Sequence, residues 1–142
     1  MLSPSLEDYL EEVYRFFINK ESIRIKDIAN TLRVSMPSVV KGLKRLHNLG
    51  YITYIPYEDI IVTDKGKRVG KFLVQRNKIL KDFVTIIGSD CDVKQEAEAM
   101  EHYLSKSTII AIEKLVKYFS NNEEILKNYK NYKIQSNLDE FK

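Results

Sequence analysis

The chain is short of the residues on which several common protein classes depend. It has one cysteine and two histidines among its 142 residues. A single cysteine excludes an internal disulfide. Cys91 stands in a polar run, where an exposed loop thiol is one interpretation and a metal or redox role is the alternative. Without a Ser/His/Asp set or a glycine-rich phosphate loop, the sequence favours a protein that is not an enzyme and takes no small organic substrate.

Long apolar segments are also missing. No stretch reaches the roughly 18 apolar residues that a membrane-spanning helix needs. The first residues, Met1–Ser5, show neither the basic nor the apolar region of a signal peptide. We therefore expect a cytoplasmic protein without membrane contact.

Charge is unevenly distributed, although the net value is only +3. Asp27 is the single acid between Ser22 and Tyr57, a segment that holds six lysines and arginines. Acids gather instead in residues 7–12 and 96–101. This pattern predicts phosphate binding in the basic segment and cation binding in the acidic ones.

The order of predicted elements in the first half indicates a DNA-binding fold. Ser5 is the predicted N-cap of a first helix, and a second helix covers residues 26–32. A third helix is capped by Ser35 and ends near Gly50. The β-branched and aromatic segments 51–55 and 60–63 then predict a β-hairpin. Three short helices, a tight turn and a hairpin are typical of a winged helix-turn-helix.

The second half is predicted to be helical. Helices are expected over residues 64–87, 93–104, from Ser107 onward, and over 123–134. Their apolar stripe is larger than one small lobe can cover, which predicts a homodimer. The predicted fold is mainly α with a small β-hairpin: a winged helix-turn-helix DNA-binding domain over residues 1–71 and a helical dimerisation and metal-binding domain over 72–142.

The third helix carries the predicted contacts to double-stranded DNA. An α-helix fits the major groove, where its first residues meet base edges, and basic residues further along contact phosphates. The alternative is a solvated basic surface, and the acids Glu58 and Asp59 in the hairpin argue against strong unaided binding. The predicted DNA-binding residues are Arg24, Lys26, Ser35, Pro37, Ser38, Lys41, Lys44, Arg45 and Tyr57.

Two sets of acids have helical spacing. Asp8 and Glu11 lie on the polar side of the first helix, and Glu98, Glu101 and His102 share one face of a later helix. Carboxylates crowded on one face repel each other unless a cation binds them. Solvated acidic faces are the alternative for both sets.

Residues 4–11, 63–70 and 98–102 together resemble the diphtheria-toxin-repressor family, in particular its short manganese-transport-regulator branch. The resemblance covers essentially the whole chain. It implies a dimeric repressor that binds operator DNA, responds to a metal ion and controls metal-uptake genes.

The resemblance also implies a ligand set in which metal bridges the first helix to the dimerisation domain. The matching positions are Asp8, Glu11, Asn77, Glu98, Glu101 and His102. Such an oxygen-rich set suits Mn²⁺, with Fe²⁺ as an alternative and one or two ions per subunit. Asn77 departs from the family, which has a histidine there. The site can therefore be weakened, hold one ion instead of two, or be degenerate in a metal-independent winged-helix regulator.

Overall fold

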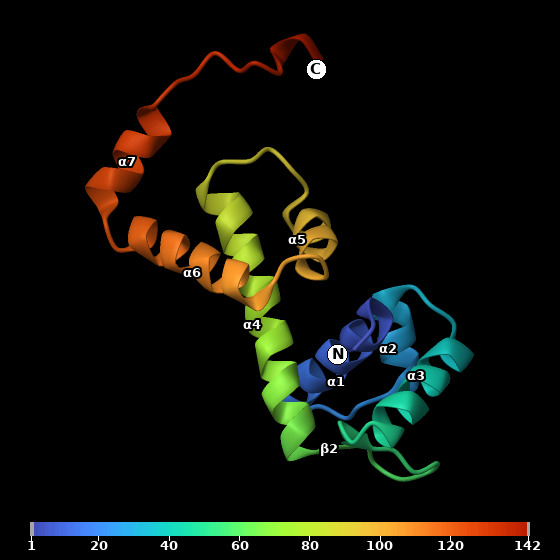
Figure 1. The fold of residues 1–142 in the computed structure, drawn as a ribbon. Helices are drawn as coiled ribbons and strands as arrows, with labels where there is room; N and C mark the ends of the chain where they lie inside the picture. Colours follow the sequence, from blue (N-terminus) through green and yellow to red (C-terminus); the bar gives the residue numbers. More distant parts are fainter. Residues whose placement is uncertain (1, 142) are drawn as a thin grey trace. The chain divides into compact units, whose positions relative to one another are not determined.

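The computed structural model describes residues 2–141, which form two compact units. The first unit ends at Arg76 and the second covers Asn77–Lys142, so the division falls within one helix. The elements, shown in Figure 1, are α1 (Pro4–Ile18), α2 (Ile25–Leu32), α3 (Met36–Asn48), β1 (Ile52–Thr53), β2 (Ile61–Val62), α4 (Asp64–Ile86), α5 (Val93–Glu101), α6 (Lys106–Ser120), α7 (Glu123–Asn131) and the 3-10 turn Asp139–Phe141. The predicted fold class, mainly α with one small hairpin, is confirmed.

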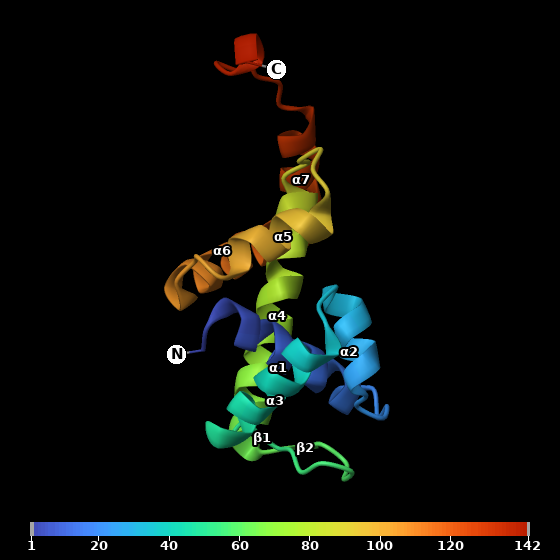
Figure 2. The same cartoon turned by 90° about the vertical axis from the view of Figure 1, so that its right-hand side faces the viewer.

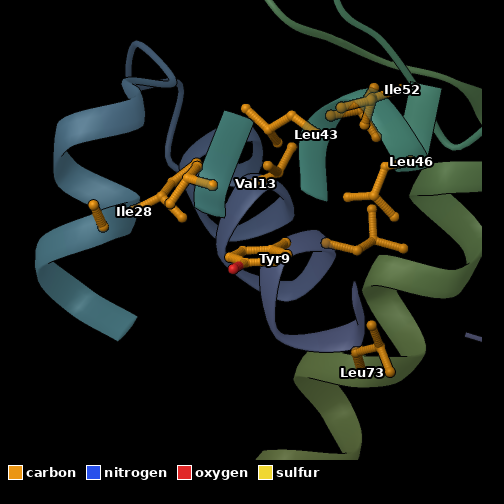
Figure 3. Close-up of a cluster of buried hydrophobic side chains, with 11 residues drawn as sticks. Tyr9, Val13, Ile28, Leu43, Leu46, Ile52 and Leu73 are labelled. Carbon is orange, nitrogen blue, oxygen red and sulfur yellow. The ribbon is translucent and has the colours of Figure 1, made fainter. Parts of the chain in front are cut away.

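The core of the first unit forms where α1, α2 and α3 meet. Val13, Ile28, Leu43 and Leu46 are fully buried there, and Figure 3 shows them converging with side chains from the hairpin and from α4. In α1 and α3 the buried residues recur every three or four positions, which places them on one face of each helix. Burying one such aliphatic side chain stabilises the fold by about 1.5–3 kcal/mol. This packing fixes the orientation of α3 and therefore which of its residues face solvent.

A tight turn joins α2 to α3. Arg33 ends α2 in the left-handed region, with φ 55° and ψ 45°, and the N–H of Val34 donates to the carbonyl of Ala29 at 3.0 Å. Ser35 then caps α3, because its hydroxyl accepts the N–H of Ser38 at 3.2 Å. The predicted cap at Ser35 is confirmed.

The hairpin is shorter than the sequence predicts. β1 and β2 pair antiparallel with Ile52 opposite Val62, and only two residues of each strand join the sheet (Figure 2). Pro56 has no N–H to donate to a partner strand. Tyr57 follows with a positive φ of 69°, which turns the chain away from strand geometry. The connection is therefore a broad loop with Tyr57 near its tip.

The second unit has a smaller core. Leu80 of α4, Ala97 of α5 and Ile109 of α6 are buried together. The hydroxyl of Tyr129 on α7 donates to the carbonyl of Ile87 at 3.0 Å. Within residues 2–141, no helix combines the length and the apolar character needed to cross a bilayer.

Several helix ends differ from the sequence prediction. Ser3, not Ser5, caps α1: its hydroxyl accepts the N–H of Leu6, and Pro4 occupies the first turn, where a missing N–H costs nothing. Ser105, not Ser107, caps α6 by accepting the N–H of Thr108 at 3.2 Å. α5 ends at Glu101 instead of reaching residue 104, and α7 ends at Asn131 instead of 134.

Replacing Gly66 should destabilise the first unit. A Cβ at this position of α4 would meet the backbone carbonyl oxygen of Tyr51, which accepts hydrogen bonds from both the N–H and the hydroxyl of Thr63. Alanine normally favours a helix over glycine, so the steric effect opposes the intrinsic preference. We expect Gly66→Ala to lower the free energy of unfolding by about 1–3 kcal/mol, measured by urea denaturation.

The matched control is Arg68→Ala, an exposed position on the same helix. It should change stability by less than about 0.5 kcal/mol. If Gly66→Ala is as stable as the parent chain, the backbone at Tyr51 and α4 can move apart to fit the new methyl group without a loss of folding free energy, and the prediction is wrong.

Candidate functional site

The surface of α3 is the first candidate site. Buried residues of α3 face the core, namely Val39, Gly42, Leu43 and Leu46, whereas Lys41, Lys44 and Arg45 are exposed. Met36 is 48% exposed, and together with Pro37, Val40, Lys41 and Lys44 it lines a surface hollow of about 460 Å³. α3 thus presents apolar side chains beside two lysines.

All nine predicted DNA-binding residues are exposed in the first unit. They are Arg24, Lys26, Ser35, Pro37, Ser38, Lys41, Lys44, Arg45 and Tyr57. A second hollow beside α1 is lined in part by Ser38, Lys41, Lys44 and Arg45. Exposure permits contact with DNA, and binding by each residue stays a prediction.

The hairpin is fastened to the end of α3. The N–H of Tyr54 donates to Nδ1 of His47 at 3.0 Å, and Nζ of Lys65 donates to the carbonyl of Leu49 at 2.8 Å while lying over the ring of Tyr51. His47 therefore has a structural role that its sequence position did not reveal. The first contact joins the hairpin to the last turn of α3, and the second joins the start of α4 to the residue that follows α3.

The acids of α1 are not a simple solvated face. Asp8 is half-buried, and the side chain of Glu11 is only 12% exposed. NH2 of Arg15 donates to Glu11 at 3.1 Å, one helical turn along α1. This contact with Arg15 was not predicted, although the spacing of four residues is a recognised signal for an ion pair.

Next to Asp8, Glu7 takes part in a buried ion pair. NH1 of Arg76 donates to the Glu7 carboxylate at 3.3 Å, and the guanidinium lies 5.7 Å from the ring centre of Phe72. The Arg76 side chain is only 6% exposed, and among residues 2–141 its Nε and other terminal nitrogen have no hydrogen-bond partner. The pair joins α1 to α4 within the first unit and so restrains the helix that carries Asp8.

The second unit contains a buried polar cluster around Glu101. Glu101 is 2% exposed and Asn77 is 4% exposed. Nδ2 of Asn77 donates to Oε2 of Glu101 at 3.1 Å, and Nε2 of His102 lies 3.6 Å from Oε1. The sequence predicted that Glu98, Glu101 and His102 share a face. The structure brings Glu101 and His102 together, whereas Glu98 is exposed.

The chemistry of this cluster fits a divalent cation. A carboxylate and an imidazole are ligands for Mn²⁺ and Fe²⁺. An ionised carboxylate can only accept hydrogen bonds, so the amide NH₂ of Asn77 faces Glu101. In this arrangement Asn77 supports a ligand through its nitrogen, and its amide oxygen is directed elsewhere.

Comparisons with known proteins identify two family domains in the chain. The family profile "Iron dependent repressor, N-terminal DNA binding domain" matches residues 1–60, and "Iron dependent repressor, metal binding and dimerisation domain" matches 63–129. The chain is 38% identical over 139 residues to the HTH-type transcriptional regulator MntR of Lysinibacillus sphaericus (strain C3-41), covering 97% of this chain and all of that one. It is also 38% identical over 131 residues to MntR of Bacillus subtilis (strain 168), covering 92% of each.

Solved structures show the same fold in longer proteins. The manganese regulator SloR matches with a TM-score of 0.71 and 25% identity over 82% of this chain. The metal-dependent transcriptional regulator MtsR matches with a TM-score of 0.67 and 27% identity, also over 82%. The chain spans about half of each, 55% in both cases.

These matches confirm the resemblance stated from the sequence, and they confirm that the chain is a regulator and not an enzyme. Its two family profiles together cover most of its length. The chain belongs to the iron-dependent repressor family, with a winged helix-turn-helix DNA-binding domain followed by a metal-binding and dimerisation domain.

Proposed function

We propose that this chain is a manganese-responsive repressor that binds operator DNA as a homodimer and controls metal-uptake genes. The observation that carries the proposal is the buried Glu101 carboxylate, with His102 beside it, in a metal-binding family domain. The manganese regulator among the structural relatives favours this ion. A target in chromosomal DNA implies a cytoplasmic protein.

We assign the metal ligands to both units. Asp8 and Glu11 come from α1, and the remaining positions come from α4 and α5 or directly follow α5. The full proposed set is Asp8, Glu11, Asn77, Glu98, Glu101 and His102. Four carboxylates and one imidazole suit Mn²⁺, with Fe²⁺ as an alternative ion and one or two ions per subunit.

The proposed regulation follows from charge. When bound, the cation supplies positive charge that lets the carboxylates stay close together. Asp8 and Glu11 then restrain α1, which packs directly on α3. Since coupling between two sites is reciprocal, DNA binding must strengthen metal binding by the same factor.

A metal-independent regulator is the second candidate, and two contacts favour it. Asn77 donates a hydrogen bond to Glu101, and Arg15 forms an ion pair with Glu11. Both carboxylates therefore have partners in the chain itself. In this case the site is degenerate, and DNA affinity does not respond to Mn²⁺.

The exposed apolar side chains of α6 support dimerisation. Ile110, Leu115 and Tyr118 are 55%, 39% and 52% exposed in the single chain. We expect sedimentation equilibrium at micromolar concentration to give twice the chain mass of 16.6 kDa. A species of 16.6 kDa would contradict a homodimer.

Restoring a histidine at position 77 should strengthen Mn²⁺ binding. Asn77→His adds a nitrogen donor where the amide now donates to Glu101. We expect about a tenfold gain in affinity, or about 1–2 kcal/mol, measured by calorimetry on metal-free protein. Metal-dependent operator binding should then begin at a lower Mn²⁺ concentration.

Asn77→Ala is the matched control, because it removes the hydrogen bond to Glu101 without supplying a ligand. It should not reproduce the gain. If the parent chain binds no Mn²⁺ in the micromolar range, or if Asn77→His binds no better, the metal-independent candidate is preferred.

Basic residues of α3 should contribute to DNA affinity in different ways. We expect Lys44→Ala and Arg45→Ala to weaken binding equally on all sequences and to reduce the salt dependence by about one ion, because they contact phosphates. Lys41→Ala should weaken operator binding more than binding to random DNA. Lys127→Ala, an exposed lysine of α7, is the control. Fluorescence anisotropy at several salt concentrations measures all four, and unchanged affinity in the three α3 variants would place the DNA elsewhere.

A further inference from the structure

The outward surface of α3 has a feature that general DNA affinity does not require, which is an apolar patch near the N-terminal end of the helix. Met36 and Val40 are one helical turn apart and lie side by side. Met36 is 48% exposed, and Val40 is partly exposed. Both line the 460 Å³ hollow, with Lys41 and Lys44 at its edge. Contacts to phosphate alone would need only the lysines.

The polar side chains of the first turn are engaged within the helix. The hydroxyl of Ser35 accepts the N–H of Ser38 at 3.2 Å. The two serine hydroxyls also lie 2.9 Å apart, in hydrogen-bond contact. A base edge that approaches this turn therefore meets the side chains of Met36, Pro37 and Val40 without displacing the cap.

The occupant of this patch must be apolar where it touches Met36 and Val40, and anionic where it touches the lysines. The major groove of A·T base pairs meets both requirements, because thymine exposes a C5-methyl group between the phosphate backbones. A G·C pair would instead place hydrogen-bonding groups against side chains that cannot bind them. The charge of Lys41 and Lys44 disfavours an uncharged apolar partner.

We propose that Met36 and Val40 read thymine methyl groups in each operator half-site, while Lys44 contacts the flanking phosphate. The helical repeat of about 5.4 Å separates the two side chains by between one and two base-pair steps of about 3.4 Å. The two thymines therefore lie one or two base pairs apart. The inference rests on the proposed function, in that α3 must enter the major groove.

The test removes single methyl groups from the DNA. An operator is first selected from a random duplex library with the wild-type dimer and Mn²⁺. Each thymine is then replaced by deoxyuridine, which keeps all hydrogen-bonding groups and lacks only the C5-methyl. We expect affinity to fall about threefold to fivefold at each of two nearby positions per half-site, the effect of losing one buried methyl group. Replacements elsewhere should have no effect.

The protein variants assign each methyl group to a side chain. Val40→Ala should bind the thymine and deoxyuridine operators equally at one of the two positions, and Met36→Ala at the other. Met36 is exposed, so its replacement leaves the core intact. Lys44→Ala is the control, since it should weaken binding while keeping the preference for thymine at both positions.

The outcomes separate this inference from the proposed function. Specific Mn²⁺-dependent binding that is unaffected by every deoxyuridine overturns the methyl contacts and leaves the repressor assignment intact. A methyl preference that survives in both Met36→Ala and Val40→Ala also overturns them. If no duplex is selected, with or without Mn²⁺, both the repressor function and the methyl contacts are wrong. The patch would then bind a partner other than DNA.

Discussion

The buried Glu101 carboxylate, which is 2% exposed, is a strong physical constraint on the second unit. Removing a carboxylate from water carries an effective penalty of several kcal/mol unless charge or hydrogen bonds compensate for it. Asn77 compensates in part, but it is neutral, and His102 carries charge only when it is protonated. A bound cation would add a positive charge next to this carboxylate. The need to compensate a buried carboxylate therefore explains both the buried Asn77 amide next to Glu101 and the fit of a divalent ion to this cluster.

Sequence patterns predicted the elements whose signals lie within a few residues. The Ser35 cap and the three-helix order followed by a hairpin needed only local spacing, and they are present in the structure. Helix ends were less predictable, because Ser3 and Ser5 are both suitable caps and Pro4 decides between them. The strand length depended on the backbone at Tyr57, whose positive φ has no signal in an aromatic residue.

In the candidate sites, too, features set by local spacing were predictable and features set by long-range contacts were not. Helical periodicity was enough to predict that Lys41 and Lys44 are exposed, because the buried face of α3 is strongly apolar. The partner of Asn77 is 24 residues away and that of Arg76 is 69 residues away, so only tertiary packing could reveal them. The resemblance names position 77 as a ligand position, which stays a prediction, and the structure adds that the Asn77 amide nitrogen donates to Glu101.

The donor role of Asn77 has opposite effects on the two states of the site. The hydrogen bond stabilises the buried Glu101 carboxylate when no cation is present. A cation bound through Oε2 would share that oxygen with the amide, so it would gain less from an acceptor that already has a partner. A histidine at this position would bind the ion directly and would leave Glu101 less stabilised before the ion arrives. On the proposed ligand set, the asparagine would therefore stabilise the metal-free state and weaken the response to Mn²⁺.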